Sequence, residues 1–180
     1  MNKKTYKLVV MAMLTALGYV FILFIRTPIF PSAPYLVYDA GDVPIILGTL
    51  MFGPLEGLAM TAVLSFLQMI FLSTDGFIGF IMHVAATGML VMVSGLLYKK
   101  HKTKKHAIIG LILGSIGMML IMVPINYLVQ VFYYGQPSSF IIPLLPTIAA
   151  FNAIKAFGNS LIVILIYKPL SRFIKGKMAK

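Results

Sequence analysis

The sequence predicts an all-α integral membrane protein with six transmembrane helices and with both termini on the cytoplasmic side. Three observations support this fold class. Of the 180 residues, 60% are hydrophobic and only 11% are charged, a composition typical of a chain that lies mostly in lipid. Apolar stretches of about 18 residues or more, the length of a transmembrane helix, recur along the chain. Lysine and arginine cluster in three segments between or beyond those stretches, a pattern typical of cytoplasmic segments.

The whole chain, residues 1–180, is expected to form a single membrane domain, because no long polar stretch remains for a soluble one. The absence of cysteine excludes disulfides, thiolate catalysis and cysteine metal sites. The net charge of +11 does not indicate nucleic acid binding, because the cations flank apolar spans instead of covering one soluble face. They indicate membrane topology and contacts with anionic lipid.

The first apolar stretch, residues 8–25, follows three lysines and resembles a signal peptide. It is longer than the apolar core of such a peptide, and the residues that follow it make a poor cleavage site, so we interpret it as the first span. Ala12 and Ala16 lie four residues apart within it. On a helix they form a small-residue strip that another helix could approach closely.

Residues 26–42 contain three prolines, which disfavour helix and favour extended backbone. Asp42 precedes Val43 and Pro44. A carboxylate followed by proline is typical of a helix start, where the carboxylate accepts hydrogen bonds from free backbone amides. Asp39 has no such structural role and is the better candidate for a functional carboxylate.

The next apolar stretch, residues 43–53, would be only roughly 16 Å long as a helix, against a hydrocarbon core of about 30 Å. Longer spans follow at residues 55–72 and 77–98. Thirteen of the fifteen lysine and arginine residues lie in the N-terminal segment, in residues 99–105 and in the C-terminal tail. These segments are expected to share the cytoplasmic side, which requires an even number of crossings. Residues 43–53 therefore count as a short, protein-buried crossing.

The span at residues 77–98 carries His83 and Thr87 one helical turn apart. A histidine in such a span more often bonds to a neighbouring helix than binds a metal, and no second ligand stands at metal-binding spacing. We therefore predict no metal site. The span at residues 107–133 contains Gly110 and Gly114, a second small-residue pair, and carries Asn126 in its second half.

The last span, residues 147–167, carries Asn152, Lys155 and Asn159, which lie three and four residues apart and share one helical face. A charge at bilayer depth costs about 2.5–3.5 kcal/mol and is tolerated where it faces the bundle interior or a wet cavity and has a partner. Two interpretations stay open for Lys155. It lines a ligand cavity, or it braces helices through backbone carbonyls or an acidic residue.

With both termini inside, the polar residues of the last two spans lie in the outer halves of their helices, under two loops. This arrangement predicts a pocket that opens outward. We find no phosphate-binding loop, metal-ligand cluster, serine elbow or pair of intramembrane carboxylates. We therefore expect a protein without catalytic residues, which binds a ligand but cannot drive its transport alone.

Five motifs in this order resemble the substrate-binding S component of an energy-coupling factor (ECF) vitamin transporter, and the riboflavin-specific members most closely. The resemblance covers most of the chain. The motifs are Ala12-x-x-x-Ala16, Tyr35-Leu36-x-x-Asp39-x-x-Asp42-Val43-Pro44, Phe52-Gly53-Pro54-Leu55-x-Gly57, Asn126-Tyr127 and Phe151-Asn152-x-Ile154-Lys155.

The resemblance implies a multi-pass protein of the bacterial plasma membrane that binds riboflavin from the outside with high affinity and carries no cofactor of its own. Its implied partners are a T component and two ABC ATPases, with Ala12 and Ala16 as the docking strip. The ligand-contacting positions implied or suggested are Asn126, Asn152, Lys155, Asp39, Tyr127 and Asn159.

Two alternatives remain from the sequence. The turn at residues 73–76, with His83 and Thr87, departs from the riboflavin binders and leaves room for another vitamin such as pantothenate, whose carboxylate would pair with Lys155. In a different functional class, the chain would be a membrane assembly protein without a transport role, in which Lys155 only braces helices.

Overall fold

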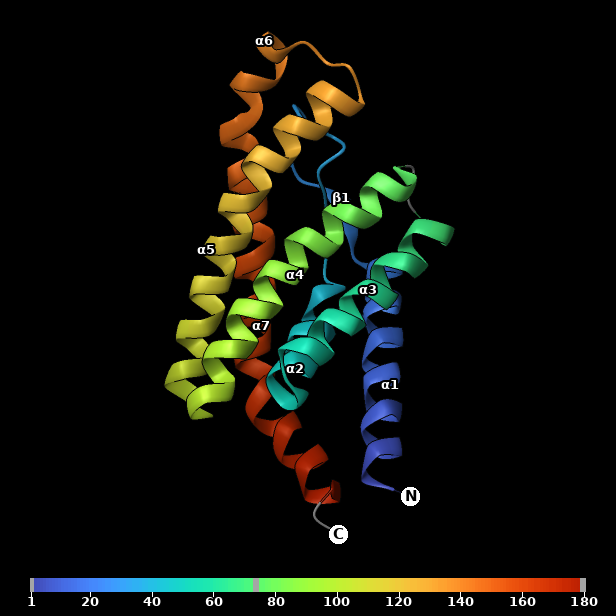
Figure 1. The fold of residues 1–180 in the computed structure, drawn as a ribbon, viewed down its shortest axis with the longest axis vertical. Helices are drawn as coiled ribbons and strands as arrows, with labels where there is room; N and C mark the ends of the chain where they lie inside the picture. Colours follow the sequence, from blue (N-terminus) through green and yellow to red (C-terminus); the bar gives the residue numbers. More distant parts are fainter. Residues whose placement is uncertain (1, 73–74, 179–180) are drawn as a thin grey trace.

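The computed structural model describes residues 2–72 and 75–178 and shows an elongated helical bundle (Figure 1). Five of its helices are long and apolar enough to cross a membrane. The main helices are α1 (Lys3–Phe24), α2 (Asp42–Phe52), α3 (Pro54–Phe71), α4 (Gly76–His101), α5 (Lys104–Leu128) and α7 (Leu145–Met178). The start of α1 and the end of α7 lie at the same end of the bundle (Figure 1).

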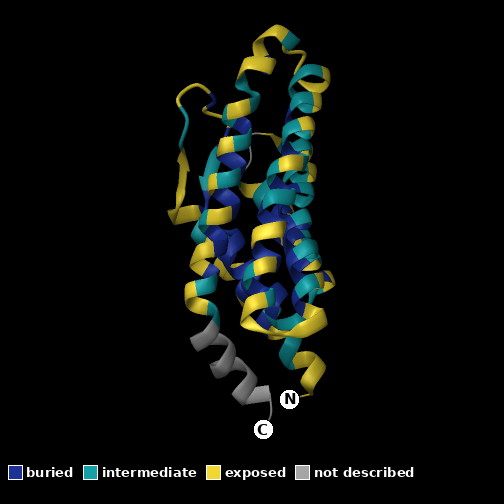
Figure 2. Cartoon of the chain, turned by 90° about the vertical axis from the view of Figure 1, so that its left-hand side faces the viewer, coloured by how far each residue is buried: buried dark blue, intermediate teal, exposed yellow. Residues whose placement is uncertain are grey.

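The short helix α2 lies in the interior, as the sequence predicted for residues 43–53. Nine of its eleven residues, from Asp42 to Leu50, are buried. It ends where Gly53 adopts a φ of +128°, a conformation that favours glycine, and Pro54 then begins α3. Residues with large apolar side chains cover the outside of the bundle, and the buried positions lie along its middle (Figure 2). An apolar exterior suits a protein surrounded by lipid.

The proline-rich segment forms a small hairpin, which the sequence did not predict. Strands β1 (Arg26–Pro28) and β2 (Val37–Asp39) pair antiparallel, with Arg26 opposite Asp39. The predicted extended backbone is present, but the pairing depends on contacts with the bundle that no local pattern encodes. Residues 134–146, which separate the predicted spans 107–133 and 147–167, also contain short helices. These are α6 (Ser138–Ile141) and the 3₁₀ turn η2 (Ile142–Leu144), which follow the π-helical turn η1 (Val129–Tyr133).

The small-residue pair on α5 lies against α4, in agreement with its spacing. A Cβ atom built on Gly110 would lie 2.9 Å from the backbone oxygen of Ser94, and one built on Gly114 would lie 2.7 Å from the backbone oxygen of Leu90. Both distances are too short for a real contact. The two helices therefore approach at backbone distance because these positions carry no side chain.

We predict that Gly114→Ala lowers the free energy of unfolding by about 1–3 kcal/mol, because the added methyl group forces the α4 backbone away. Gly117→Ala is the matched control on the same helix. Its added Cβ would meet the flexible end of Met89 at 3.0 Å, which can move at little cost. Thermal unfolding in detergent compares the two variants, and equal losses would contradict the backbone contact between α4 and α5.

Candidate functional site

A cavity of about 450 Å³ lies between the hairpin region and helices α3, α4, α5 and α7. Its wall combines amides, charged groups, aromatic rings and methionines. The hairpin region contributes Arg26, Pro34, Tyr35, Leu36, Val37 and Asp39; α3 contributes Ser65, Gln68 and Met69; α4 contributes Gly79, Phe80, Met82, His83 and Ala86; α5 contributes Met118, Met122 and Asn126; α7 contributes Phe151, Asn152 and Lys155. Asp75, Gln130, Tyr134 and Gln136 complete the wall.

Four of the six predicted ligand-binding residues line this cavity: Asp39, Asn126, Asn152 and Lys155. The two asparagines face it from different helices, and each donates its side-chain nitrogen to the carbonyl four residues earlier, at 2.8 Å. A side-chain amide has two donor hydrogens and a carbonyl oxygen. Each asparagine therefore keeps hydrogen-bonding capacity for a bound molecule.

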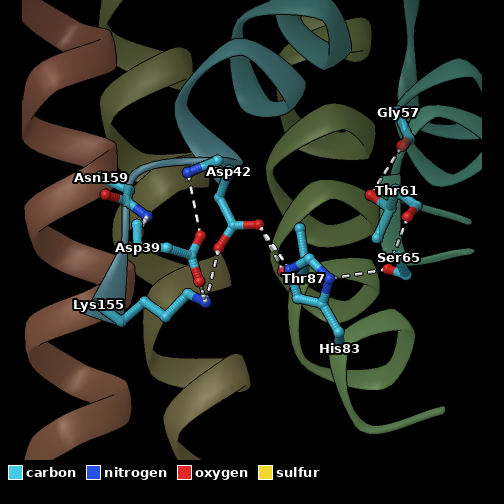
Figure 3. A network of polar contacts seen from close by, with 10 residues as sticks. Asp39, Asp42, Gly57, Thr61, Ser65, His83, Thr87, Lys155 and Asn159 are labelled. Atoms are coloured by element: carbon cyan, nitrogen blue, oxygen red, sulfur yellow. Dashed lines mark hydrogen bonds and ion pairs between the residues drawn. The ribbon is translucent and has the colours of Figure 1, made fainter. Parts of the chain in front are cut away.

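Lys155 is paired with an acid inside the bundle. Its Nζ lies 2.7 Å from Oδ2 of Asp39 and 3.8 Å from Oδ2 of Asp42 (Figure 3). The three side chains are between 1% and 9% exposed. The sequence left open whether this lysine lines a cavity or braces the bundle, and the geometry combines the two: Lys155 lines the cavity and also ties α7 to β2. Its contact with a ligand stays a prediction.

Asn159 belongs to the attachment of the hairpin and does not line the cavity. Its Nδ2 donates to the backbone oxygen of Asp39 at 3.2 Å, and its Oδ1 accepts from the hydroxyl of Tyr38 at 2.9 Å. Burial and the neighbouring Asp39 carboxylate raise the pKa of Tyr38, so its hydroxyl stays protonated and able to donate. Asn159 therefore holds β2 against α7.

Tyr127 also lies outside the cavity wall. Its hydroxyl donates to Oγ of Ser138 at 3.2 Å and so links the end of α5 to α6. Direct contact between Tyr127 and a ligand stays a prediction. Among the aromatic residues, Tyr35, Phe80, Tyr134 and Phe151 are the ones that line the cavity.

The predicted capping role of Asp42 is wrong, although α2 does begin at this residue. Oδ1 of Asp42 accepts hydrogen bonds from Oγ1 of Thr87 at 2.9 Å and from Nε2 of His83 at 3.1 Å, both on α4 (Figure 3). The carboxylate is 1% exposed and needs strong donors. Two side chains of α4 supply them across the helix interface, as the sequence predicted for the histidine alone.

Sequence reasoning missed a second pair of charges at the cavity. Arg26 and Asp75 both line it. Arg26 donates to the backbone oxygen of Leu72 at 2.9 Å, and Asp75 accepts from the hydroxyl of Tyr134 at 3.1 Å. A signal for Arg26 was present, because it is one of two cations outside the three basic segments.

Comparison with known proteins places this geometry in context. The model of the family described as the ECF transporter, substrate-specific component, matches residues 6–167. Riboflavin transporter RibU of Staphylococcus aureus (strain TCH60) is 31% identical over 94% of this chain and 92% of its own. Riboflavin transporter FmnP of Bacillus subtilis (strain 168) is 30% identical over 96% of this chain and 95% of its own.

A solved structure of the S component of a bacterial ECF transporter has a similar fold. It superimposes with a TM-score of 0.84 at 31% identity and covers 96% of this chain and 99% of its own.

We predict that Lys155→Met destabilises the unliganded protein by about 3–5 kcal/mol, because it leaves the buried Asp39 carboxylate without its cation. Adding Asp39→Asn should restore most of that stability. Lys7→Met is the matched control, since it breaks a partly exposed ion pair with Glu56 and should cost less than about 1 kcal/mol. Thermal unfolding in detergent measures all three, and a double variant no more stable than Lys155→Met would argue against the pairing.

Proposed function

Because the chain belongs to the family of ECF transporter substrate-specific components, we propose that it is the subunit that binds riboflavin for uptake across the bacterial plasma membrane. The proposal is supported by the names of its relatives, riboflavin transporters that are 25–31% identical over most of the chain. The observation that carries it is the cavity, in which amides and aromatic rings surround a lysine that is already neutralised.

The chemistry of the cavity suits the flavin ring. Asn126 and Asn152 can match the alternating donors and acceptors of the ring edge, and Lys155 can donate to a ring carbonyl while it keeps its contact with Asp39. Aromatic and methionine side chains in the wall offer apolar contacts to the ring faces. A few polar groups in a largely apolar wall are typical of a site for one planar ligand.

The charges in the wall favour an uncharged ligand over pantothenate. Lys155 is paired with Asp39, and the other arginine or lysine among the described wall residues, Arg26, shares the wall with Asp75. A pantothenate carboxylate would have to displace a protein carboxylate from Lys155. Riboflavin needs no such exchange.

The proposal includes a topology and a set of partners. Both termini lie in the cytoplasm, residues 1–180 act as one membrane domain, and the cavity opens outward beneath the hairpin. Since the sequence carries no nucleotide-binding motif, a T component with two ABC ATPases drives release of the vitamin into the cell. Ala12 and Ala16 are exposed on α1, as the docking of a foreign helix requires.

We predict that the purified protein quenches riboflavin fluorescence on binding, and that Asn126→Ala and Asn152→Ala each weaken binding by about 0.5–1.5 kcal/mol through a lost hydrogen bond. The control is Ser115→Ala, which removes a buried hydroxyl that contacts Ser160 away from the cavity. Excess pantothenate should leave riboflavin bound. Displacement by pantothenate, or equal effects of all three variants, would overturn the assignment of ligand or site.

We predict that replacing Ala12 and Ala16 together with leucine blocks co-purification of the T component and abolishes riboflavin uptake by cells, because the bulkier side chains keep a partner helix at a distance. Riboflavin binding by the isolated double variant should be unchanged. Leucine at Met13, which is 66% exposed on the same helix, is the control. Uptake at the normal rate by the double variant would place the docking surface elsewhere.

A further inference from the structure

His83 lies in the cavity wall with both ring nitrogens in use. Nδ1 is 2.8 Å from Oγ of Ser65 on α3, and Nε2 is 3.1 Å from Oδ1 of Asp42 on α2 (Figure 3). The histidine side chain is 11% exposed. The family resemblance gave this residue no role, and its two contacts determine which protons the ring carries.

The contact with Ser65 requires a proton on Nδ1. A serine hydroxyl has one hydrogen, and Oγ of Ser65 lies 2.7 Å from the backbone oxygen of Thr61. A carbonyl oxygen only accepts, so the serine hydrogen lies in that contact. Oγ of Ser65 is then an acceptor toward the ring, and Nδ1 of His83 is the donor.

The contact with Asp42 requires a proton on Nε2. An ionised carboxylate only accepts, and Oδ1 of Asp42 also accepts from Thr87 at 2.9 Å. Nε2 of His83 is therefore a donor as well. A histidine that donates from both nitrogens is an imidazolium cation.

The charge balance of the site agrees with this proton count. The carboxylates of Asp39 and Asp42 both lie within 4 Å of Nζ of Lys155. With a neutral His83, two buried negative charges would share one cation, an arrangement that costs free energy. With an imidazolium, the four groups, which we call the charge quartet, sum to zero.

We propose that His83 is held as an imidazolium in the unliganded protein and acts as a positioning residue for the ligand site. The imidazolium holds the Asp42 carboxylate against α4. Oδ2 of Asp42 then stays 3.8 Å from Nζ of Lys155. Lys155 is then left to Asp39 and to the ligand. If His83 loses its proton, Asp42 lacks a cation and competes for Lys155, which draws Nζ away from the cavity and loosens β2.

The sign of the pH dependence follows from this arrangement. The protonated state is the one that binds, so affinity falls when His83 loses its proton. Asp42 from α2 and the neutral Ser65 from α3 contact the His83 ring. Lys155 from α7 and Asp39 from β2 lie on the far side of Asp42 (Figure 3). Further along the cavity wall lie Arg26, Asp75 and Tyr134.

The first test reads the proton directly and needs no ligand. The purified protein is labelled with ¹⁵N in its histidine rings, and the chain has three histidines. His101 is exposed, His106 is half-buried, and neither lines the cavity. They serve as internal references, with His83→Gln assigning the remaining signal. At neutral pH both ring nitrogens of His83 should give protonated signals of similar shift. One protonated and one unprotonated nitrogen would overturn the proposal.

The second test measures riboflavin affinity from about pH 5.5 to about pH 8.5 and rests on the proposed function. Wild type should bind roughly tenfold more tightly at the acidic end, and His83→Gln, which keeps hydrogen-bonding groups without the charge, should bind weakly and without that pH step. His101→Gln, an exposed histidine, should retain the wild-type profile. A wild-type profile as flat as that of His83→Gln would refute the positioning role.

The two tests distinguish an error in the proposed function from an error in the proposed charge of His83. If riboflavin does not bind at any pH, the proposed function is wrong, while the nitrogen shifts still decide whether the charge quartet exists.

Discussion

The pairing of Lys155 with Asp39 is the interaction on which the rest of the site depends. A cation inside a membrane span needs a partner, and here the partner is a buried aspartate of strand β2, 116 residues earlier. The ion pair therefore attaches β2 to α7, and Asn159 reinforces it by holding the backbone of the same aspartate. Because the hairpin is attached in this way, a proline-rich segment becomes an ordered wall of the cavity.

The sequence predicted the helices well because their cause is local. The length of each apolar stretch and the distribution of lysine and arginine are enough to give five long spans and the buried short helix α2. The strand pairing and the partners of Asp42 were not predictable in this way. Thr87 and His83 lie more than 40 residues after Asp42, and no spacing within α2 indicates that α4 supplies donors there.

Part of the site was also predictable, because a polar residue in an apolar span has to face the interior. This argument selected Asn126, Asn152 and Lys155, which line the cavity. It selected Asn159 as well, which shares the α7 face of Asn152 and Lys155 but does not line the cavity. Seven residues separate Asn152 from Asn159, about 10 Å along a helix axis. A shared helical face therefore predicts the side of the helix from which a side chain projects. It does not predict whether the side chain lies level with the cavity along the helix axis, which depends on the neighbouring elements.

The shortness of α2 leaves room for the cavity. None of the described residues that line the cavity comes from α2, which starts at Asp42, three residues after the lining residue Asp39. A full-length span here would fill the space with backbone, and each added turn would take up about 5.4 Å of it. The cavity thus occupies space that a longer α2 would have filled, and the segment that precedes α2 forms part of its wall. Moving the point where loop becomes helix would deepen or fill such a chamber without altering the other spans, which offers one scaffold a way to accommodate cargo of different sizes.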